Sequence, residues 1–156
     1  MPRFELTDVE EMPYLYEERS CSMDPQDISS AMGEAFVCVM KFFKNHNIES
    51  AGKVLSVYYT YDPKVMTFRA GFSVAKEDAA KAEGAVKAAV TPAGRVLTFT
   101  HLGPYSDLRK SYAEMMKYIE DNHLKLGTPT WEVYVNNPET VPEAELRTDV
   151  FVSLAS

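Results

Sequence analysis

The chain has 156 residues, 46% of them hydrophobic and 25% charged, which suits one globular domain of ordinary size and excludes wholesale disorder. Its formal net charge is −7, and no Lys/Arg cluster is longer than Arg109-Lys110. This excludes the basic surface that direct nucleic-acid binding requires, and mildly favours cationic partners.

Cysteine usage and hydropathy predict the compartment. Cys21 and Cys38 are too few for a disulfide framework, and the sequence has neither a charged-then-apolar leader nor a long apolar run. We therefore expect a cytoplasmic protein with no membrane partner. Cys38 falls in an expected helix, where a buried structural thiol is the simpler interpretation. No metal-ligand spacing is present, so we expect no metal and no cofactor.

The first half predicts a strand, a helix and a hairpin in that order. Residues 13–21 alternate loosely, as in an edge strand, and from 27 to 43 apolar residues recur at helical spacing. Residues 53–61 and 68–74 alternate as strands, with Asp62-Pro63 supplying the turn between them.

The segment 76–89 is rich in Ala, Lys and Glu. We interpret it as a connector without chemistry of its own, formed either by a short helical piece or by a mobile linker.

The second half predicts the same order again. Residues 95–102 alternate as a strand and precede a helix that Ser106 could cap. Gly127 and Pro129 are expected to break the chain before a strand that contains Trp131.

The two halves have the features of an internal repeat. Asn45-His46 matches Asn122-His123, and Asp62-Pro63 matches Asn137-Pro138, in the same order. We therefore predict an α+β fold of duplicated β-α-β-β units, with an antiparallel sheet, helices on one face and a ligand cleft between the pseudo-symmetric halves. The predicted single domain spans 1–156, with repeats at about 8–75 and 94–156 joined by a linker at about 76–93.

Glu132 is the candidate functional residue. Matching the two Asx-Pro pairs places Val57 opposite Glu132 and Tyr59 opposite Tyr134, so a carboxylate replaces an apolar residue on one strand face. If that face is buried, the carboxylate must be paired or hydrogen-bonded, or it takes up a proton. It could then bind an organic cation among aromatic rings, or donate and accept a proton in a reaction.

The alternative is that Glu132 is an ordinary surface residue. Its neighbours Trp131 and Val133 make the other strand face apolar, which in a one-sided sheet would leave Glu132 in solvent.

Aromatic residues form the second functional signal. The chain has nine tyrosines and one tryptophan, and tyrosine combines a flat apolar ring with a polar tip. We predict a wall of Tyr59, Tyr61 and Tyr134, and add Tyr16 and Trp131 as ligand-binding residues, although core packing is the alternative for each. Among the histidines, His46 and His123 fit helix capping, and the role of His101 is open.

The second half also resembles a known family. The resemblance is carried by these residues in order: Gly94-Arg95, His101-Leu102-Gly103-Pro104-Tyr105, Leu108, Tyr112, Glu132-Val133-Tyr134, Asn137-Pro138 and Arg147-Thr148-Asp149-Val150. Together they resemble the GyrI-like small-molecule-binding domain, which includes effector-binding domains of transcription regulators. The first half is similar only through its duplicated plan.

The resemblance implies a cleft between two pseudo-symmetric halves, with Glu132 contacting cationic aromatic drugs and Tyr134 beside it. It also implies an alternative, because some stand-alone relatives hydrolyse strained cyclopropane-bearing natural products with an acidic residue in the same cleft. Glu132 and Tyr134 would then be catalytic. No helix-turn-helix precedes the domain, so we expect a stand-alone member.

Three functions follow as hypotheses. The first is a stand-alone binder of hydrophobic, often cationic, aromatic molecules at Glu132. The second is the cyclopropane hydrolase, and the third is a protein-interaction module such as a gyrase inhibitor. The ligand, the enzyme status and the oligomeric state, including a homodimer through a sheet edge, stay open.

Overall fold

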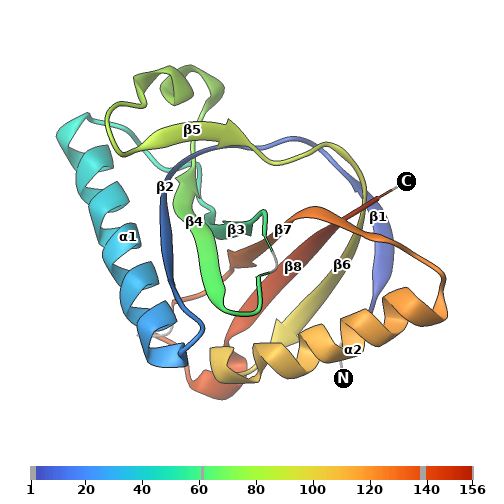
Figure 1. The fold of residues 1–156 in the computed structure, drawn as a ribbon. Helices are drawn as coiled ribbons and strands as arrows, with labels where there is room; N and C mark the ends of the chain where they lie inside the picture. Colours follow the sequence, from blue (N-terminus) through green and yellow to red (C-terminus); the bar gives the residue numbers. More distant parts are fainter. Residues whose placement is uncertain (1–2, 61, 138–139, 156) are drawn as a thin grey trace.

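The computed structural model describes residues 3–60, 62–137 and 140–155, and the fold in Figure 1 is built on one antiparallel sheet. The strands are β1 (Glu5–Val9), β2 (Pro13–Ser22), β3 (Val54–Tyr58), β4 (Val65–Ser73), β5 (Lys87–Val90), β6 (Gly94–Leu102), β7 (Leu126–Tyr134) and β8 (Arg147–Leu154). The helices are α1 (Pro25–Asn45) and α2 (Leu108–Asp121), with short 3-10 turns η1 (Lys76–Lys81), η2 (Tyr105–Asp107) and η3 (Glu143–Glu145).

The sheet order confirms the predicted duplication. Across the described residues the eight strands run β1-β6-β8-β7-β3-β4-β2-β5, all antiparallel. The units β2-α1-β3-β4 and β6-α2-β7-β8 therefore meet at the β3–β7 pair, with the order mirrored on its two sides. The predicted α+β fold of repeated β-α-β-β units is confirmed.

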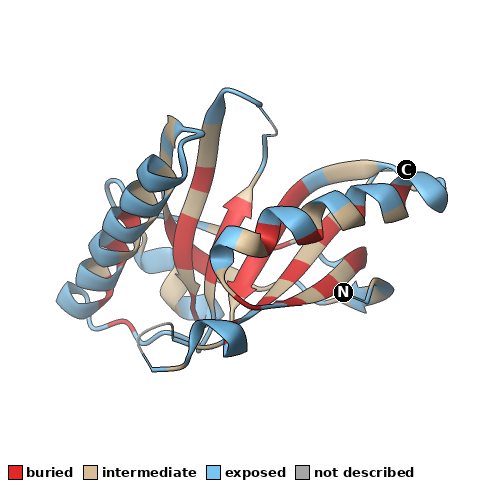
Figure 2. Ribbon diagram, turned by 90° about the horizontal axis from the view of Figure 1, so that it is seen from below, coloured by how far each residue is buried: buried red, intermediate tan, exposed pale blue. Residues whose placement is uncertain are grey.

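Both helices cover one face of the sheet and stand on either side of the central strands (Figure 2). Helix α1 begins at the Asp24 cap and packs Val39 and Phe43 against Leu15 of β2. Helix α2 packs Met115 and Ile119 in the same way, against apolar residues of β6 and β8. The helical spacing of these apolar residues is what turns one side of each helix toward the sheet.

The other face of the sheet carries a separate apolar core. Its buried members are Tyr14, Tyr16, Leu55, Val57, Val96, Trp131 and Val133. The connection between β1 and β2 and the connection between β5 and β6 both pass beside this core. The Met12 N–H donates to Thr91 Oγ1 and the Thr91 N–H donates to the Met12 carbonyl, each at 3.0 Å, and Met12 packs against the core. Both faces are thus covered, which explains why successive residues of β7, from Pro129 to Val133, are all buried.

Several local predictions need correction. Two strands, β1 and β5, were not predicted, and β5 pairs with the start of β2, so only the remainder of β2 is an edge. Asp107, not Ser106, precedes α2, and it makes no side-chain cap bond. Strand β7 already begins at Leu126 and continues through Gly127 and Pro129, with a register shift before Thr130.

Cys38 is exposed, so its interpretation as a buried thiol is wrong. The Asx-Pro turn holds as predicted, because the Asp62 carboxylate accepts hydrogen bonds from the backbone of Lys64 and Val65. In the described part of the chain, no helix has both the length and the apolar composition needed to cross a bilayer.

Candidate ligand-binding site

Glu132 lies at the centre of the sheet, on β7, between Ser56 of β3 and Val150 of β8. Only 5% of its surface is exposed. Cross-strand partners point to the same side of a sheet, so Glu132 shares the helix-covered face with Ser56 and, by alternation, with Tyr58 and Tyr134. The alternative that Glu132 is an ordinary surface residue is therefore wrong.

The predicted equivalence of Val57 and Glu132 in the two repeats is also wrong, because the two side chains lie on opposite faces of the sheet. Val57 lies opposite Trp131 in the β3–β7 register and belongs to the core on the other face. Matching the Asx-Pro pairs shifted the repeat by one residue, and a shift of one residue exchanges the two faces of a strand.

The helix ends show the correct repeat. The backbone N–H of His46 at the end of α1, and that of Asn122 at the end of α2, both bond to the last helical carbonyls, and a residue with positive φ follows each. The sequence offset that matches His46 with Asn122 also matches Ser56 with Glu132. Because Ser56 and Glu132 are also direct cross-strand partners, the pseudo-twofold axis passes between them.

Three tyrosine hydroxyls converge on the Glu132 carboxylate. Tyr112 of α2 donates to Oε2 at 2.6 Å, and Tyr134 donates to Oε1 at 2.7 Å. The Tyr58 hydroxyl lies 3.4 Å from the same Oε1, and Ser56 Oγ lies 3.0 Å from the Tyr134 hydroxyl. The two short distances are typical of O–H donors to an ionised carboxylate. We call these five residues the Glu132 cluster.

Aromatic rings from both helical sides surround this cluster. Phe36 of α1 meets the Tyr134 ring edge-on, with centroids 6.3 Å apart, and Tyr105 of η2 meets it from another side at 5.5 Å. Met32 of α1 reaches Ser56, with its sulfur 3.8 Å from Oγ. Tyr105 is 38% exposed, so the rings extend from the buried carboxylate to the surface.

Burial controls the ionisation of the cluster. It raises the pKa of Glu132, and the hydrogen bonds from Tyr112, Tyr134 and Tyr58 offset part of that rise. Burial, with the Glu132 charge second, also holds the pKa values of Tyr58 and Tyr134 well above their ordinary value. The tyrosines therefore act as neutral donors, and the carboxyl can either hold a cation or exchange a proton.

His101 supports the site without touching the carboxylate. It is 5% exposed, and Nε2 lies 3.0 Å from the Pro104 carbonyl while Nδ1 lies 2.8 Å from Ser111 Oγ. A carbonyl only accepts, so Nε2 carries the proton in the neutral ring. His101 thereby ties α2 to the turn that presents Tyr105, a role that the sequence left open. His46 caps α1 as predicted, with Nδ1 3.0 Å from the Phe42 carbonyl.

Most of the other predicted ligand-binding residues lie apart from Glu132. Tyr16 and Tyr59 both contact Arg69, whose guanidinium carbon lies 4.5 Å and 4.4 Å from their ring centroids. Tyr16 and Trp131 belong to the core of the other face, and Tyr59 shares Arg69 with Tyr16, so the structure does not bring these three residues to the Glu132 carboxylate. Tyr59 and Tyr134 do not form a common wall, and Tyr61 lies outside the described residues.

Four aromatic residues near Glu132 were not predicted as site residues. Phe36 and Tyr58 fell within segments predicted as a helix and a strand, and Tyr112 was named only in the family resemblance. Tyr105 appeared only in the family resemblance. The offset that matches His46 with Asn122, in place of the predicted match of His46 with His123, pairs Phe36 with Tyr112 and Tyr58 with Tyr134.

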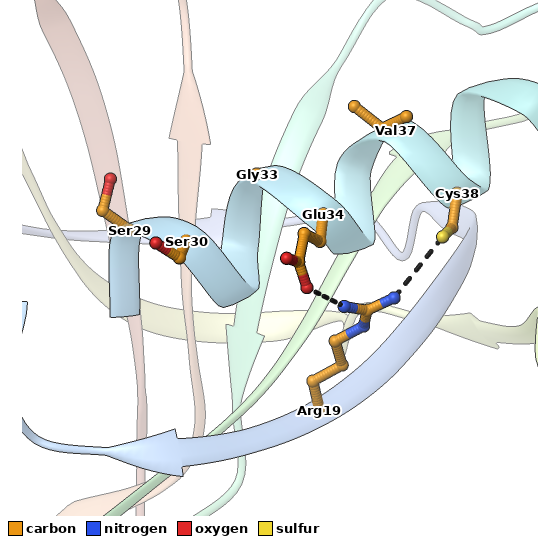
Figure 3. Close-up of a pocket in the computed structure, with 7 residues that line it drawn as sticks. All are labelled: Arg19, Ser29, Ser30, Gly33, Glu34, Val37 and Cys38. Atoms are coloured by element: carbon orange, nitrogen blue, oxygen red, sulfur yellow. Dashed lines mark hydrogen bonds and ion pairs between the residues drawn. The ribbon is translucent and has the colours of Figure 1, made fainter. Parts of the chain in front are cut away.

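Two surface hollows have none of the five cluster residues in their lining. One, shown in Figure 3, lies along α1 and is lined by Gly33, Val37 and Cys38, with Arg19 of β2 bonded to Glu34 and to the Cys38 sulfur. The other lies beside the start of α2 and includes Thr100, Lys110 and Glu114. Neither is lined by Glu132, whose carboxylate is covered by tyrosines.

Within the described ranges, no group of three or more His, Cys, Asp or Glu side chains is placed to hold a metal ion.

Solved structures share this fold. A crystal structure of the EcmrR C-terminal domain has 21% identity and a TM-score of 0.82, covering 100% of this chain and 99% of that domain. In a cryo-EM structure of an EcmrR–DNA complex, with 20% identity and a TM-score of 0.82, the match covers 99% of this chain but only 58% of the EcmrR chain. This chain therefore spans less than two thirds of that EcmrR chain.

Two further structures are more distant. SAV2435 bound to tetraphenylphosphonium has 10% identity and a TM-score of 0.67, covering 99% of this chain and 94% of that one. A hydrolase encoded by lin2189 from Listeria innocua has 16% identity and a TM-score of 0.59, covering 98% and 92%. At these identities the likeness shows a shared fold.

A comparison with curated proteins found no match. The family comparison is decisive, because the profile of the GyrI-like small molecule binding domain matches residues 2–155, nearly the whole chain. The resemblance noted in the second half therefore extends through both repeats, and the chain belongs to the GyrI-like small molecule binding domain family.

Proposed function

We propose that the protein binds hydrophobic, cationic aromatic molecules, with Glu132 as the anionic anchor. One observation carries the proposal: a carboxylate at the centre of the sheet is buried among aromatic side chains. The described residues give it tyrosine hydrogen bonds but no ion pair. A buried charge of this kind is costly unless it is compensated, and a cationic ligand supplies the compensation.

The surroundings fit the same class of ligand. Tyr134, Tyr58 and Phe36 bring aromatic rings close to the carboxylate, and the face of such a ring attracts an organic cation. The ligand would displace the Tyr112 hydroxyl, since Tyr112 reaches Glu132 from the helix whereas Tyr58 and Tyr134 belong to the sheet. The family and the tetraphenylphosphonium complex of SAV2435 support this choice of ligand.

Calorimetric titration with tetraphenylphosphonium tests the proposal. Glu132→Gln keeps the shape of the side chain and removes its charge, so we expect affinity to fall by at least about 30-fold. The matched control is Glu120→Gln, which removes the same charge from an exposed position on α2. Equal dissociation constants for the wild type and Glu132→Gln would refute the anchor.

A second candidate function is hydrolysis of a strained cyclopropane at the same cluster. The raised pKa of Glu132, caused by burial, suits a general base or acid, and the lin2189 hydrolase shares the fold. Glu132 would accept a proton from water while the water oxygen bonds to a ring carbon. The strained C–C bond would break, and its electrons would move to a conjugated carbonyl oxygen, which takes a proton from Tyr134. Tyr134 would regain its proton from the protonated Glu132 with which it is hydrogen-bonded, so both residues return to their starting states.

The product would be the substrate plus one water molecule, which mass spectrometry detects directly. We expect Glu132→Gln to abolish turnover of a cyclopropane-bearing alkylator. A compound that stays intact after long incubation with the wild-type protein would rule out this activity for that substrate.

A further inference from the structure

The pseudo-twofold axis gives the Glu132 cluster two related sides, and this deepens the proposed function, on which it rests. Because the axis passes between Ser56 and Glu132, a cation held by the carboxylate lies close to the axis. Each side of the axis is then built by one repeat, with α1 on one side and α2 on the other.

Each repeat contributes an aromatic ring at the equivalent helical position. Phe36 in α1 and Tyr112 in α2 stand at the same distance along the chain from the matched caps His46 and Asn122. The Phe36 ring meets Tyr134, and the Tyr112 hydroxyl meets the carboxylate, so both helices turn this position toward the central strands.

The central strands β3 and β7 also carry aromatic residues at equivalent positions of the two repeats. Tyr58 of β3 and Tyr134 of β7 are equivalent under the same offset, and both hydroxyls lie near Oε1 of Glu132, at 3.4 Å and 2.7 Å. The symmetry fails at the axis itself, where one repeat supplies Ser56 and the other the carboxylate. The site thus has one anion, Glu132, and two aromatic walls, which are formed by Phe36 on the α1 side and by Tyr112 on the α2 side.

We propose that the site selects cations that carry two aryl groups, one on each side of the cationic centre. A ligand of this shape places its charge beside Glu132 and one ring against each wall. A cation with a single aryl group can use either wall but not both. Aromatic contacts exceed the contribution of buried area alone, so an alkyl arm of similar size does not replace the second ring.

Three quaternary ammonium probes of equal charge test this: benzyltrimethylammonium, dibenzyldimethylammonium and benzylhexyldimethylammonium. The last two differ in whether the second arm carries a ring. We expect the dibenzyl cation to bind about fivefold more tightly than the benzylhexyl cation. Phe36→Leu should remove most of that advantage and change benzyltrimethylammonium affinity by less than about twofold, since one ring can take the α2 side.

Phe42→Leu is the matched control, because Phe42 lies on the same helix but stacks on His46. Phe36→Met, which keeps most of the volume without the ring, replaces Phe36→Leu if that variant fails to fold. Equal affinities for the dibenzyl and benzylhexyl cations overturn the two-wall inference alone, as does an advantage that survives loss of the Phe36 ring. Failure of all three cations to bind the wild type overturns the proposed cation binding as well.

Discussion

Replacing Glu132 with Gln should change how the free energy of unfolding depends on pH. Burial raises the pKa of Glu132 in the folded protein, whereas the unfolded chain returns the carboxyl to its ordinary pKa. Between the two values the folded protein binds more protons than the unfolded one, so stability falls as pH rises. The stability that Glu132 contributes is fully present below its pKa in the unfolded chain. That stability is lost as the pH rises through its pKa in the folded protein.

The size of the effect follows from the width of that window. Each pKa unit between the unfolded and folded values corresponds to about 1.4 kcal/mol of stability lost across the window. Tyr112, Tyr134 and Tyr58 narrow the window by stabilising the carboxylate, and a protonated His101 nearby acts in the same direction. Gln cannot ionise, so the Glu132→Gln variant lacks this loss of stability.

Urea unfolding from about pH 4 to about pH 8 measures the difference. Trp131 is the single tryptophan, is buried and stacks on Phe151, so its fluorescence reports unfolding. We expect the free energy of unfolding of the wild type, relative to Glu132→Gln, to fall with rising pH. Glu120→Gln should follow the wild type. If the free energy of unfolding depended on pH in the same way in the wild type and in Glu132→Gln, burial would not raise the pKa of Glu132.

Three further predictions concern the surroundings of the carboxylate and the sheet. Tyr112→Phe removes the 2.6 Å hydrogen bond, so it should lower stability at neutral pH by about 1.5–3 kcal/mol and move the Glu132 transition to higher pH, both measured by urea unfolding. His101→Leu should weaken tetraphenylphosphonium binding in the wild type but not in a Tyr105→Ala background; equal losses in both would mean that His101 does not act through Tyr105. Gly127→Ala should cost about 1–3 kcal/mol in thermal unfolding, because the added Cβ would lie 2.9 Å from backbone atoms at the end of β8; an unchanged midpoint would contradict this close approach.

Periodicity was sufficient to predict the architecture. Apolar spacing located α1, alternation located β3, β4 and β6, and the repeated order predicted a second helix and an antiparallel sheet with helices on one face. The missed strands β1 and β5 are short edge strands that depend on pairing with β6 and β2. Their own composition is weakly strand-like, as in the Lys-Ala-Ala-Val of β5.

The site was predicted only in part. Assigning a residue to one face of a strand by comparing the two repeats requires an alignment that is exact to one residue. Glu132 and Tyr134 were found, but an offset wrong by one selected Val57 and Tyr59 in place of Ser56 and Tyr58. Asp62-Pro63 lies in a turn, and turns vary in length between repeats, whereas the helix caps are fixed by backbone hydrogen bonds. Tyr112 comes to Glu132 through packing of α2 on the sheet, which no local pattern encodes.

A structure of the protein with tetraphenylphosphonium is the most direct test of the claim that Glu132 anchors a cation between two aromatic walls. We expect the phosphorus beside the Glu132 carboxylate, the Tyr112 hydroxyl displaced, and phenyl groups packed on both sides, against Phe36 and the Tyr112 ring. A ligand seated elsewhere, such as in the hollow beside Arg19 and Cys38, with the tyrosine hydrogen bonds to Glu132 intact, would contradict it.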